Sequence, residues 1–413
     1  MTGTATSQPG EGRLRNQPAV GGDVRGSAFE PALIDRVRSR LAASGGETTP
    51  AAVAAAVRAE AGGVASDLDV LAALRVLRQE FVGAGPLDEL LRDPRTTDVL
   101  VCGPASVWVD RGSGLEATGV RFADEDAVRR LAQRLAIAAG RRLDDASPYV
   151  DGWLADAGVR LHAVLPPVAA DGTCLSLRVL RPAAHDLPAL RSLGTVDATG
   201  EALLRAMLAA RLAFLISGGT GTGKTTILAA LLSAVDPRER IVCVEDAEEL
   251  RPRHPHLVRL VARPANIEGA GGVMLRDLVR QALRMRPDRL VVGEVRGAEV
   301  CDLLAALNTG HDGGAGTVHA NSARELPARM EALAAAGGLA RTALHSQLAA
   351  AVQVVLHMRR LRSGTRVLDV VGVLSRDAEG VTVRAAWTRT SGWCDAREAL
   401  GELLTDRGVR APW

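Results

Sequence analysis

One glycine-rich run constrains this chain more than any other feature. The apolar run 212–216 precedes it and a helix-compatible run, 227–232, follows it. A strand, a glycine-rich turn and a helix N-terminus in that order aim backbone N–H groups and the helix dipole at a phosphate chain. The match to G-x-x-x-x-G-K-[ST] is complete, which favours a nucleotide-binding loop over a surface turn. Its residues are Gly218, Gly219, Thr220, Gly221, Thr222, Gly223, Lys224, Thr225 and Thr226.

The motif assigns a role to two of these side chains. Lys224 is expected to reach the β- and γ-phosphates of ATP, and the hydroxyl of Thr225 is expected to bind Mg²⁺.

Size and composition exclude several kinds of protein. The chain has 413 residues, enough for two or three domains, and a formal net charge of +2 gives no global field for nucleic acid. Its five cysteines include no C-x-x-C pair, which argues against a tetracysteine zinc site and suits reduced thiols. No run of 18 apolar residues and no signal core is present. We therefore expect a cytoplasmic protein that reaches the cytoplasmic face of the cell membrane only through partners.

The hydrophobic pattern divides the chain into six expected segments. Helices are expected at 50–61 and 123–139, and strands at 99–102, 106–109, 159–164 and 174–179. In the strand 159–164, alternation places Arg160 and His162 on the polar face, and Arg178 likewise lies on the polar face of 174–179. The segments are a disordered tail at 1–28, a helical region at 29–83, a small α/β domain at 84–181, a linker at 182–195, a larger α/β domain at 196–375 and a C-terminal tail at 376–413.

Strands alternate with helices through 196–375, which predicts an α/β fold with a mainly parallel sheet. Three of its apolar strands lead directly into ionisable residues. Glu245 and Asp246 follow 240–244, Glu294 follows 290–293, and His319 follows 316–318. Open α/β sheets bind ligands at the carboxyl ends of their strands. We therefore expect these side chains beside the glycine-rich loop.

Hydrolysis of ATP requires a water molecule held in line with the γ-phosphate. Glu294 is the candidate to orient or deprotonate that water, while Gly293 stands where many P-loop enzymes carry a Mg²⁺-binding Asp. Glu245 and Glu249 are candidates to supply the missing carboxylates through water. The alternative for Glu248 and Glu249 is a simple interaction with a helix N-terminus.

Two histidines, His311 and His319, lie in the segment 308–322 and are expected to sense the γ-phosphate. Metal binding is not expected of them, since no zinc-site spacing surrounds them. We interpret the other histidines of the larger domain as structural residues: His254, His256, His345 and His357.

Four elements in this order resemble the Walker A, Asp-box, Walker B and His-box set of the type II/type IV secretion ATPase superfamily. They are the glycine-rich loop and the segments 244–250, 292–296 and 308–322. The segments 276–279, 283–287 and 308–313 are similar to the CpaF branch, the ATPases of Tad/Flp pilus assembly. Further similar stretches are 86–87, 140–144, 147–148 and 165–167, so the resemblance covers about residues 30 to 375.

The resemblance implies a RecA-like ATPase domain and a homo-hexameric ring whose amino-terminal domain closes over the nucleotide. Family arginines that touch the phosphates match Arg160 and Arg178. It also implies inner-membrane platform proteins as partners. The run Gly314-Ala315-Gly316 departs from the Ser, Leu or Thr of CpaF relatives, and we expect it to loosen the start of that strand.

Three other functions are consistent with parts of this pattern. A type IV secretion or conjugation motor that moves DNA or protein shares the same motifs. A nucleic-acid helicase predicts a basic groove with stacking aromatics, whereas aromatic residues make up 2% of this chain. A scaffold that binds nucleotide without hydrolysing it is disfavoured by Glu294.

Overall fold

The computed structural model describes residues 36–37, 40, 50–60, 83–180, 185–263, 265, 270–310 and 312–413. The chain separates into two compact units, Met1–Asp88 and Glu89–Trp413. In the first unit, α2 (Pro50–Glu60) matches the helix expected at 50–61, and η1 (Gly85–Leu87) follows later in the chain. The tail expected at 1–28 and most of the helical region expected at 29–83 lie outside the described residues.

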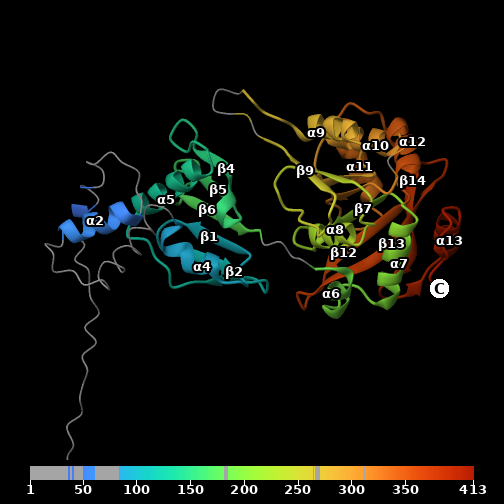
Figure 1. The fold of residues 1–413 in the computed structure, drawn as a ribbon, viewed down its shortest axis with the longest axis horizontal. Coiled ribbons are helices and arrows are strands. Elements are labelled where there is room, and N and C mark those ends of the chain that lie inside the picture. Colours follow the sequence, from blue (N-terminus) through green and yellow to red (C-terminus); the bar gives the residue numbers. More distant parts are fainter. Residues whose placement is uncertain are drawn as a thin grey trace, which may run out of the picture. The chain divides into compact units, whose positions relative to one another are not determined.

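The second unit begins with a six-stranded antiparallel sheet in the order β3-β2-β1-β6-β5-β4 (Figure 1). The helix expected at 123–139 is present as α5 and contacts β4 and β5. Its first turn is capped by Asp124, whose carboxylate accepts the N–H of Ala127. The elements are α4 (Asp88–Arg92), β1 (Asp98–Cys102), β2 (Ser106–Asp110), β3 (Leu115–Ala117), α5 (Glu125–Ala138), β4 (Tyr149–Leu154), η2 (Ala155–Ala157), β5 (Val159–Val164) and β6 (Cys174–Val179).

The predicted alternation in this sheet is confirmed. Along β5, Val159, Leu161 and Ala163 are buried while His162 is exposed and Arg160 is half-buried. A strand with one face on the core and one toward solvent shows this period of two.

The nine-stranded sheet has the order β15-β14-β13-β12-β7-β11-β10-β8-β9. Neighbouring strands are parallel throughout β12-β7-β11-β10-β8-β9. The pairs β12-β13, β13-β14 and β14-β15 are antiparallel. This arrangement confirms an α/β fold with a mainly parallel sheet. The strands are β7 (Phe214–Gly218), β8 (Ile241–Glu245), β9 (Leu257–Val261), β10 (Arg289–Val295), β11 (Ala315–Val318), β12 (Val354–Arg360), β13 (Arg366–Arg376), β14 (Val381–Thr388) and β15 (Gly392–Trp393).

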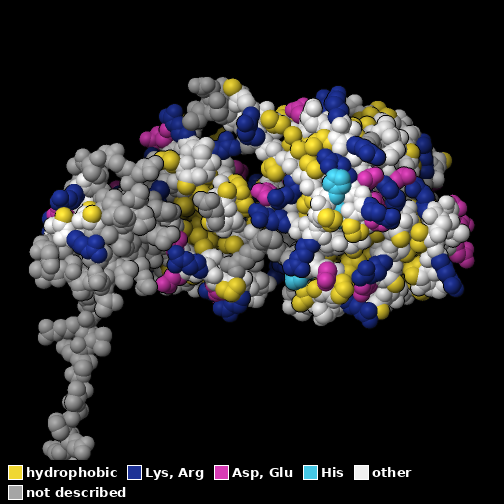
Figure 2. Space-filling view, viewed as in Figure 1, with side chains coloured by type: hydrophobic (Ala, Val, Ile, Leu, Met, Phe, Trp, Pro, Cys, Tyr) yellow, Lys and Arg dark blue, Asp and Glu magenta, His cyan; other side chains and the backbone are white. Residues whose placement is uncertain are grey.

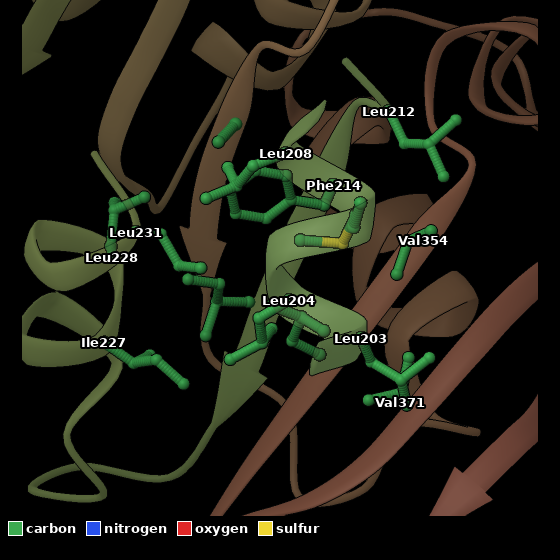
Figure 3. Packing of buried hydrophobic residues seen from close by; sticks show 14 of the residues in the cluster. Leu203, Leu204, Leu208, Leu212, Phe214, Ile227, Leu228, Leu231, Val354 and Val371 are labelled. Atoms are coloured by element: carbon green, nitrogen blue, oxygen red, sulfur yellow. The ribbon is translucent and has the colours of Figure 1, made fainter. Parts of the chain in front are cut away.

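Helices cover both faces of this sheet and form two apolar clusters. One cluster includes residues of α6, α7, α8 and α13, and the other includes residues of α9 to α12. Figure 3 shows the first cluster, in which Phe214 of β7 lies near Leu204 and Leu208 of α7. The helices are α6 (Leu187–Ser192), α7 (Ala198–Ala209), α8 (Lys224–Ser233), α9 (Leu275–Ala282), η3 (Leu283–Met285), α10 (Glu299–Leu307), α11 (Leu326–Ala336), α12 (Arg341–Ala351) and α13 (Arg397–Thr405).

The structure corrects two of the expected segments. The linker expected at 182–195 contains α6, whose Leu187 and Leu190 are buried in the first cluster. The tail expected at 376–413 forms β14, β15 and α13, with Trp387 and Leu400 buried. Each helix and strand in these segments is short, so its apolar residues become informative only when the elements that it packs against or pairs with are known.

Among the described residues, none of the helices has the length and apolar character needed to cross a lipid bilayer. On the face drawn in Figure 2, basic side chains are spread among acidic ones and are not gathered into one stripe. This mixed surface is consistent with the formal net charge of +2.

Candidate nucleotide site

The glycine-rich loop joins β7 to α8 at the carboxyl edge of the parallel strands, as the motif predicts. Gly218, Gly221 and Gly223 have φ values of 153°, 71° and 92°. A Cβ atom at Gly218 would lie 2.6 Å from the backbone oxygen of Met358 on the neighbouring strand β12. Only glycine combines these dihedral angles with such close backbone approach. The sequence of the loop is therefore dictated by its backbone path.

Lys224 is the only lysine in the sequence, so apart from the histidines the other basic residues are all arginines. Its Nζ donates to the backbone oxygens of Gly218 at 3.0 Å and Gly219 at 2.8 Å. The residue is 7% exposed, and burial lowers the pKa of its amine. A compact ammonium, unlike a guanidinium, can exchange one set of acceptors for another within the same loop. The loop thus holds a cation that is available to phosphate oxygens.

Glu294 lies within β10 near its carboxyl end, and its side chain meets two cationic or ionisable partners. One carboxylate oxygen is hydrogen-bonded to the guanidinium of Arg296, and the other, Oε1, lies 2.5 Å from Nε2 of His319. Burial pushes the pKa of Glu294 upward, but the hydrogen bond and charge of Arg296, together with His319 and Lys224, outweigh burial and the net pKa is lowered. Oε1 is buried and has no aligned hydrogen-bond donor among the described residues. The carboxylate is ionised near neutral pH and keeps acceptor capacity.

His319 follows β11 directly, as expected, and its Nε2 is 3.4 Å from Nζ of Lys224. Burial and the neighbouring Lys224 lower the pKa of His319, so the ring is neutral at pH 7. Lys224, Glu294 and His319 therefore meet at one edge, as the strand pattern predicted.

The glycines before His319 do not loosen the strand. Residues 315–318 are all buried, and β11 pairs with β7 on one side and β10 on the other. A Cβ at Gly316 would approach Leu303 and Leu215 within 3.3 and 3.4 Å. The expectation of a loosened start of this strand is corrected, because the small residue permits close packing.

Glu245 explains why glycine stands at position 293. A Cβ at Gly293 would lie 2.8 Å from Cγ of Glu245, so a larger side chain would displace that carboxylate. Oε1 of Glu245 accepts the N–H groups of Glu249 and Leu250, while Oε2 is buried and has no partner among the described residues. Burial raises the pKa of Glu245 to about 7. An acceptor is left pointing into the interior of the site.

The segment after β8 is not helical, which corrects the alternative of a helix-dipole interaction for Glu248 and Glu249. Glu248 pairs with Arg259 and Arg251, a structural arrangement. Glu249 lines the cavity over the glycine-rich loop.

The lining of that cavity shows what the site can hold. Thr225, Glu249, Glu294 and His319 all contribute to it. No group of three or more His, Cys, Asp and Glu among the described residues could hold a metal ion. A divalent cation here would depend on the hydroxyl of Thr225 and on ligand oxygens. The unpartnered Oε2 of Glu245 fits a water molecule of such an ion.

Three residues of the site were not assigned roles from sequence. Arg296 pairs with Glu294. Glu299 fixes the turn between β10 and α10, because its carboxylate accepts the N–H groups of Arg296 and Gly297. Arg366 donates from Nε to the backbone oxygen of Gly221 at 3.0 Å. Arg296 stands in the quoted motif, whereas Arg366 is brought to the loop only by the pairing of β13 with β12 and carries no local signal.

Arg160 and Arg178 are direct cross-strand partners on β5 and β6. Opposite residues of an antiparallel pair share one face, so the two guanidinium groups belong to the same polar row. Arg178 is exposed and donates from Nε to Asp98 at 3.0 Å, and Arg160 lies 3.6 Å from Asp151. The pairing of these two arginines was not foreseen from sequence.

His311 lies outside the described residues. The histidines interpreted as structural have internal partners: His345 contacts Glu331 and the N–H of Val381, and His357 contacts Ser217. His254 and His256 contact the backbone oxygen of Asp236 and the guanidinium of Arg240.

Comparison with known proteins identifies the family. The family described as "Type II/IV secretion system protein" matches residues 80–400. A Mycobacterium tuberculosis protein named for conjugal transfer is 66% identical over 347 residues, which is 83% of this chain and 98% of that protein. Conjugal transfer protein TrbB of Rhizobium radiobacter is 30% identical over 292 residues, covering 68% of this chain and 85% of TrbB.

A solved structure agrees at the level of the fold. The pilus retraction motor PilT with bound ADP has a TM-score of 0.50 and 20% sequence identity to this chain, covering 76% of this chain and 84% of PilT. With a family match over most of the chain and a P-loop, Glu294 and His319 gathered at one sheet edge, this chain belongs to the type II/IV secretion ATPases.

Proposed function

We propose that this chain is the ATP-hydrolysing motor that powers assembly of a Tad/Flp-type pilus at the cytoplasmic face of the membrane. The observation that carries the proposal is the meeting of Lys224, Glu294 and His319 over the glycine-rich loop. The stretches similar to the CpaF branch supply the choice of machine, and inner-membrane platform proteins are its expected partners.

The residues present suit each requirement of phosphoryl transfer to water. Backbone N–H groups of the loop and Lys224 bind the triphosphate, with the Nζ of Lys224 exchanging its carbonyl partners for phosphate oxygens. Mg²⁺, when bound through Thr225, supplies further charge neutralisation. Glu294 orients the attacking water and accepts its proton. His319, neutral and adjacent to both Lys224 and Glu294, detects whether the γ-phosphate is present.

Arg296 has a part in this scheme as the partner of Glu294. As long as its guanidinium occupies one carboxylate oxygen, that oxygen is not free to accept a proton. Charge-assisted hydrogen bonds to phosphate are strong. A phosphate oxygen that competes for the guanidinium of Arg296 would therefore free this carboxylate oxygen of Glu294.

The amino-terminal sheet supplies Arg160 and Arg178 to the phosphates when it closes on the nucleotide. Arg178→Ala is expected to raise the KM for ATP or lower turnover by roughly tenfold, since one charge-assisted hydrogen bond is worth about 1.5–3 kcal/mol. Arg129→Ala, which removes an ion-paired arginine of α5, is the matched control. Equal kinetic constants for Arg178→Ala and Arg129→Ala would remove Arg178 from the site.

Cyclic symmetry is the closed solution for head-to-tail contacts, and we propose a homo-hexameric ring. Light scattering of the full chain with Mg²⁺ and a non-hydrolysable ATP analogue is expected to give six times the monomer mass. A stable monomer whose turnover per subunit is independent of concentration would contradict the ring.

Conjugal transfer is a second candidate because relatives at 66% and 30% identity carry that name. A strain that lacks this gene, complemented with the wild-type or the Glu294→Gln chain, separates the two. A pilus motor predicts that surface filaments seen by electron microscopy return only with the wild type. Restored DNA transfer between cells with no change in filaments would favour the conjugation motor, as would neighbouring relaxase and coupling-protein genes.

A further inference from the structure

Two cysteines that lie far apart in sequence are placed opposite each other in the six-stranded sheet. Cys102 ends β1, Cys174 begins β6, and the register of these antiparallel strands pairs the two residues directly. Because opposite residues share a face, both thiols lie on the same side of the sheet. No spacing in the sequence indicates this pairing.

The hydrogen-bond pattern shows which kind of pair this is. The N–H of Gly103 donates to the backbone oxygen of Thr173 at 3.0 Å, just outside the pair. At the other end of the same ladder, the N–H of Val179 donates to the oxygen of Thr97 at 2.9 Å. Both bonds make Cys102 and Cys174 a non-hydrogen-bonded pair, in which Cα atoms are about 4.5 Å apart and side chains are closest. That separation is within the range of disulfides, about 4.4–6.8 Å.

The two thiols are also reduced, and one of them is accessible to a reagent. Both cysteines are free; Cys102 is exposed and Cys174 is half-buried. The Cys174 thiol donates to the backbone oxygen of Gly172 at 3.6 Å, and its pKa is raised first by burial and then by the neighbouring Cys102 thiol. Cys102 is thus the thiol that a reagent meets, and Cys174 is the thiol held beside it.

We propose that Cys102 and Cys174 form a reversible dithiol site that small-molecule disulfides oxidise to an intramolecular cross-strand disulfide. The thiolate of Cys102 attacks one sulfur of the small disulfide, forms a mixed disulfide and expels one small thiolate. The thiolate of Cys174 then attacks the sulfur of Cys102 and expels the second. Two protein thiols lose two electrons and two protons, and the small disulfide is reduced to two thiols.

The site is connected to the polar row of the same sheet. Asp98 and Arg178 are also direct partners of β1 and β6, four residues along each strand from the cysteines, and therefore lie on the same face. A disulfide would cross-link the two strands that carry this ion pair. The proposal does not depend on the proposed motor function.

The test uses the reduced full-length chain and excess oxidised glutathione, followed by alkylation and mass spectrometry. The wild type is expected to lose two of its five thiols and to yield a cross-linked peptide pair containing positions 102 and 174. Cys174→Ser is expected to keep a glutathione adduct on Cys102, because the second thiol is gone. Cys301→Ser is the matched control and is expected to form the cross-link at the wild-type rate.

Either of two outcomes overturns the proposal. One is a wild-type chain that keeps the glutathione adduct on Cys102 as Cys174→Ser does. The other is a Cys102 that stays unmodified, or is cross-linked to any cysteine except Cys174. Far-UV circular dichroism of each variant verifies folding, and a dithiol reductant that fails to restore the two thiols would contradict reversibility.

Discussion

Buried charged side chains occur at both the amino edge and the carboxyl edge of the parallel strands, but their hydrogen bonding differs between the two edges. At the amino edge, Arg289 begins β10 and is 1% exposed. Its guanidinium donates to both carboxylate oxygens of Glu239, at 2.8 and 3.1 Å, and to the backbone oxygens of Leu208 and Gly313. Every nitrogen of this buried cation has an acceptor.

At the carboxyl edge, the charges are only partly compensated. Oε2 of Glu245 is buried without a hydrogen-bond donor among the described residues. Oε1 of Glu294 faces Nε2 of His319 at 2.5 Å, and Lys224 uses acceptors of its own loop. A buried polar group without a partner costs free energy, so such groups persist where a ligand completes them. The same strand, β10, thus begins in a closed structural ion pair and ends in an open site. Predictions that separate the edges follow from this difference.

The largest effect is expected at Lys224. Lys224→Ala removes the cation that we propose binds the γ-phosphate, and ATP turnover is expected to fall below detection while the fold is retained. Because Lys224 is the only lysine, an amine-reactive ATP analogue can label no other side chain of the wild type. ATP turnover and labelling are measured together. Retained turnover in Lys224→Ala, with folding verified by circular dichroism, would show that the open edge is not the site.

A substitution at the amino edge is expected to change the stability of the fold and to leave ATP turnover unchanged. Arg289→Met removes the bidentate partner of the largely buried Glu239 and leaves that carboxylate the 3.6 Å contact with Arg211, so the free energy of unfolding is expected to fall by about 3 kcal/mol. Urea denaturation measures this change. Turnover per folded molecule should stay at the wild-type value, and Arg289→Met with Glu239→Gln should recover part of the loss. A kinetic defect without a loss of stability would erase the distinction between the edges.

Glu294→Gln, in contrast to Arg289→Met, is expected to lower ATP turnover and to leave the free energy of unfolding nearly unchanged. Binding of ATP is expected to persist, whereas hydrolysis should slow by roughly a hundredfold or more, the lower range for losing a positioned general base. Single-turnover kinetics and equilibrium nucleotide binding separate the two quantities. Turnover near the wild-type rate would remove Glu294 from the catalytic role.

The smallest effect is a pH dependence at Glu245. Its pKa of about 7 exceeds the ordinary value of 4.5, so the folded chain binds this proton more tightly than the unfolded chain. The stability that this proton contributes is present at pH 5 and is lost as pH rises toward 8, by on the order of 2 kcal/mol. Glu245→Gln should flatten that part of the stability profile. Parallel profiles for the variant and the wild type would show that Glu245 is ionised in the folded chain.

Much of the fold and of the site followed from local sequence. The expected strands 159–164 and 174–179 match β5 and β6, because a strand with one buried face shows alternating apolar and polar residues in its sequence. The loop at 218–226 and the ionisable residues at the carboxyl ends of β8, β10 and β11 were predicted at one edge. That prediction needed only the rule that parallel strands end together.

Contacts between distant segments could not be predicted in this way. Arg366 reaches the loop because β12 pairs with both β7 and β13, and Cys102 meets Cys174 through the register of β1 and β6. The unpartnered oxygen of Glu245 depends on how tightly Gly293 lies against it.

The sequence by itself determined the nucleotide loop, the α/β class and the edge at which chemistry occurs. Each of these is set by residues adjacent in the chain, whose glycine dihedral angles and strand periods are local properties. Only the tertiary structure decided which charges are paired and which remain open. Pairing depends on burial and on distances between strands far apart in sequence, and no local pattern encodes either.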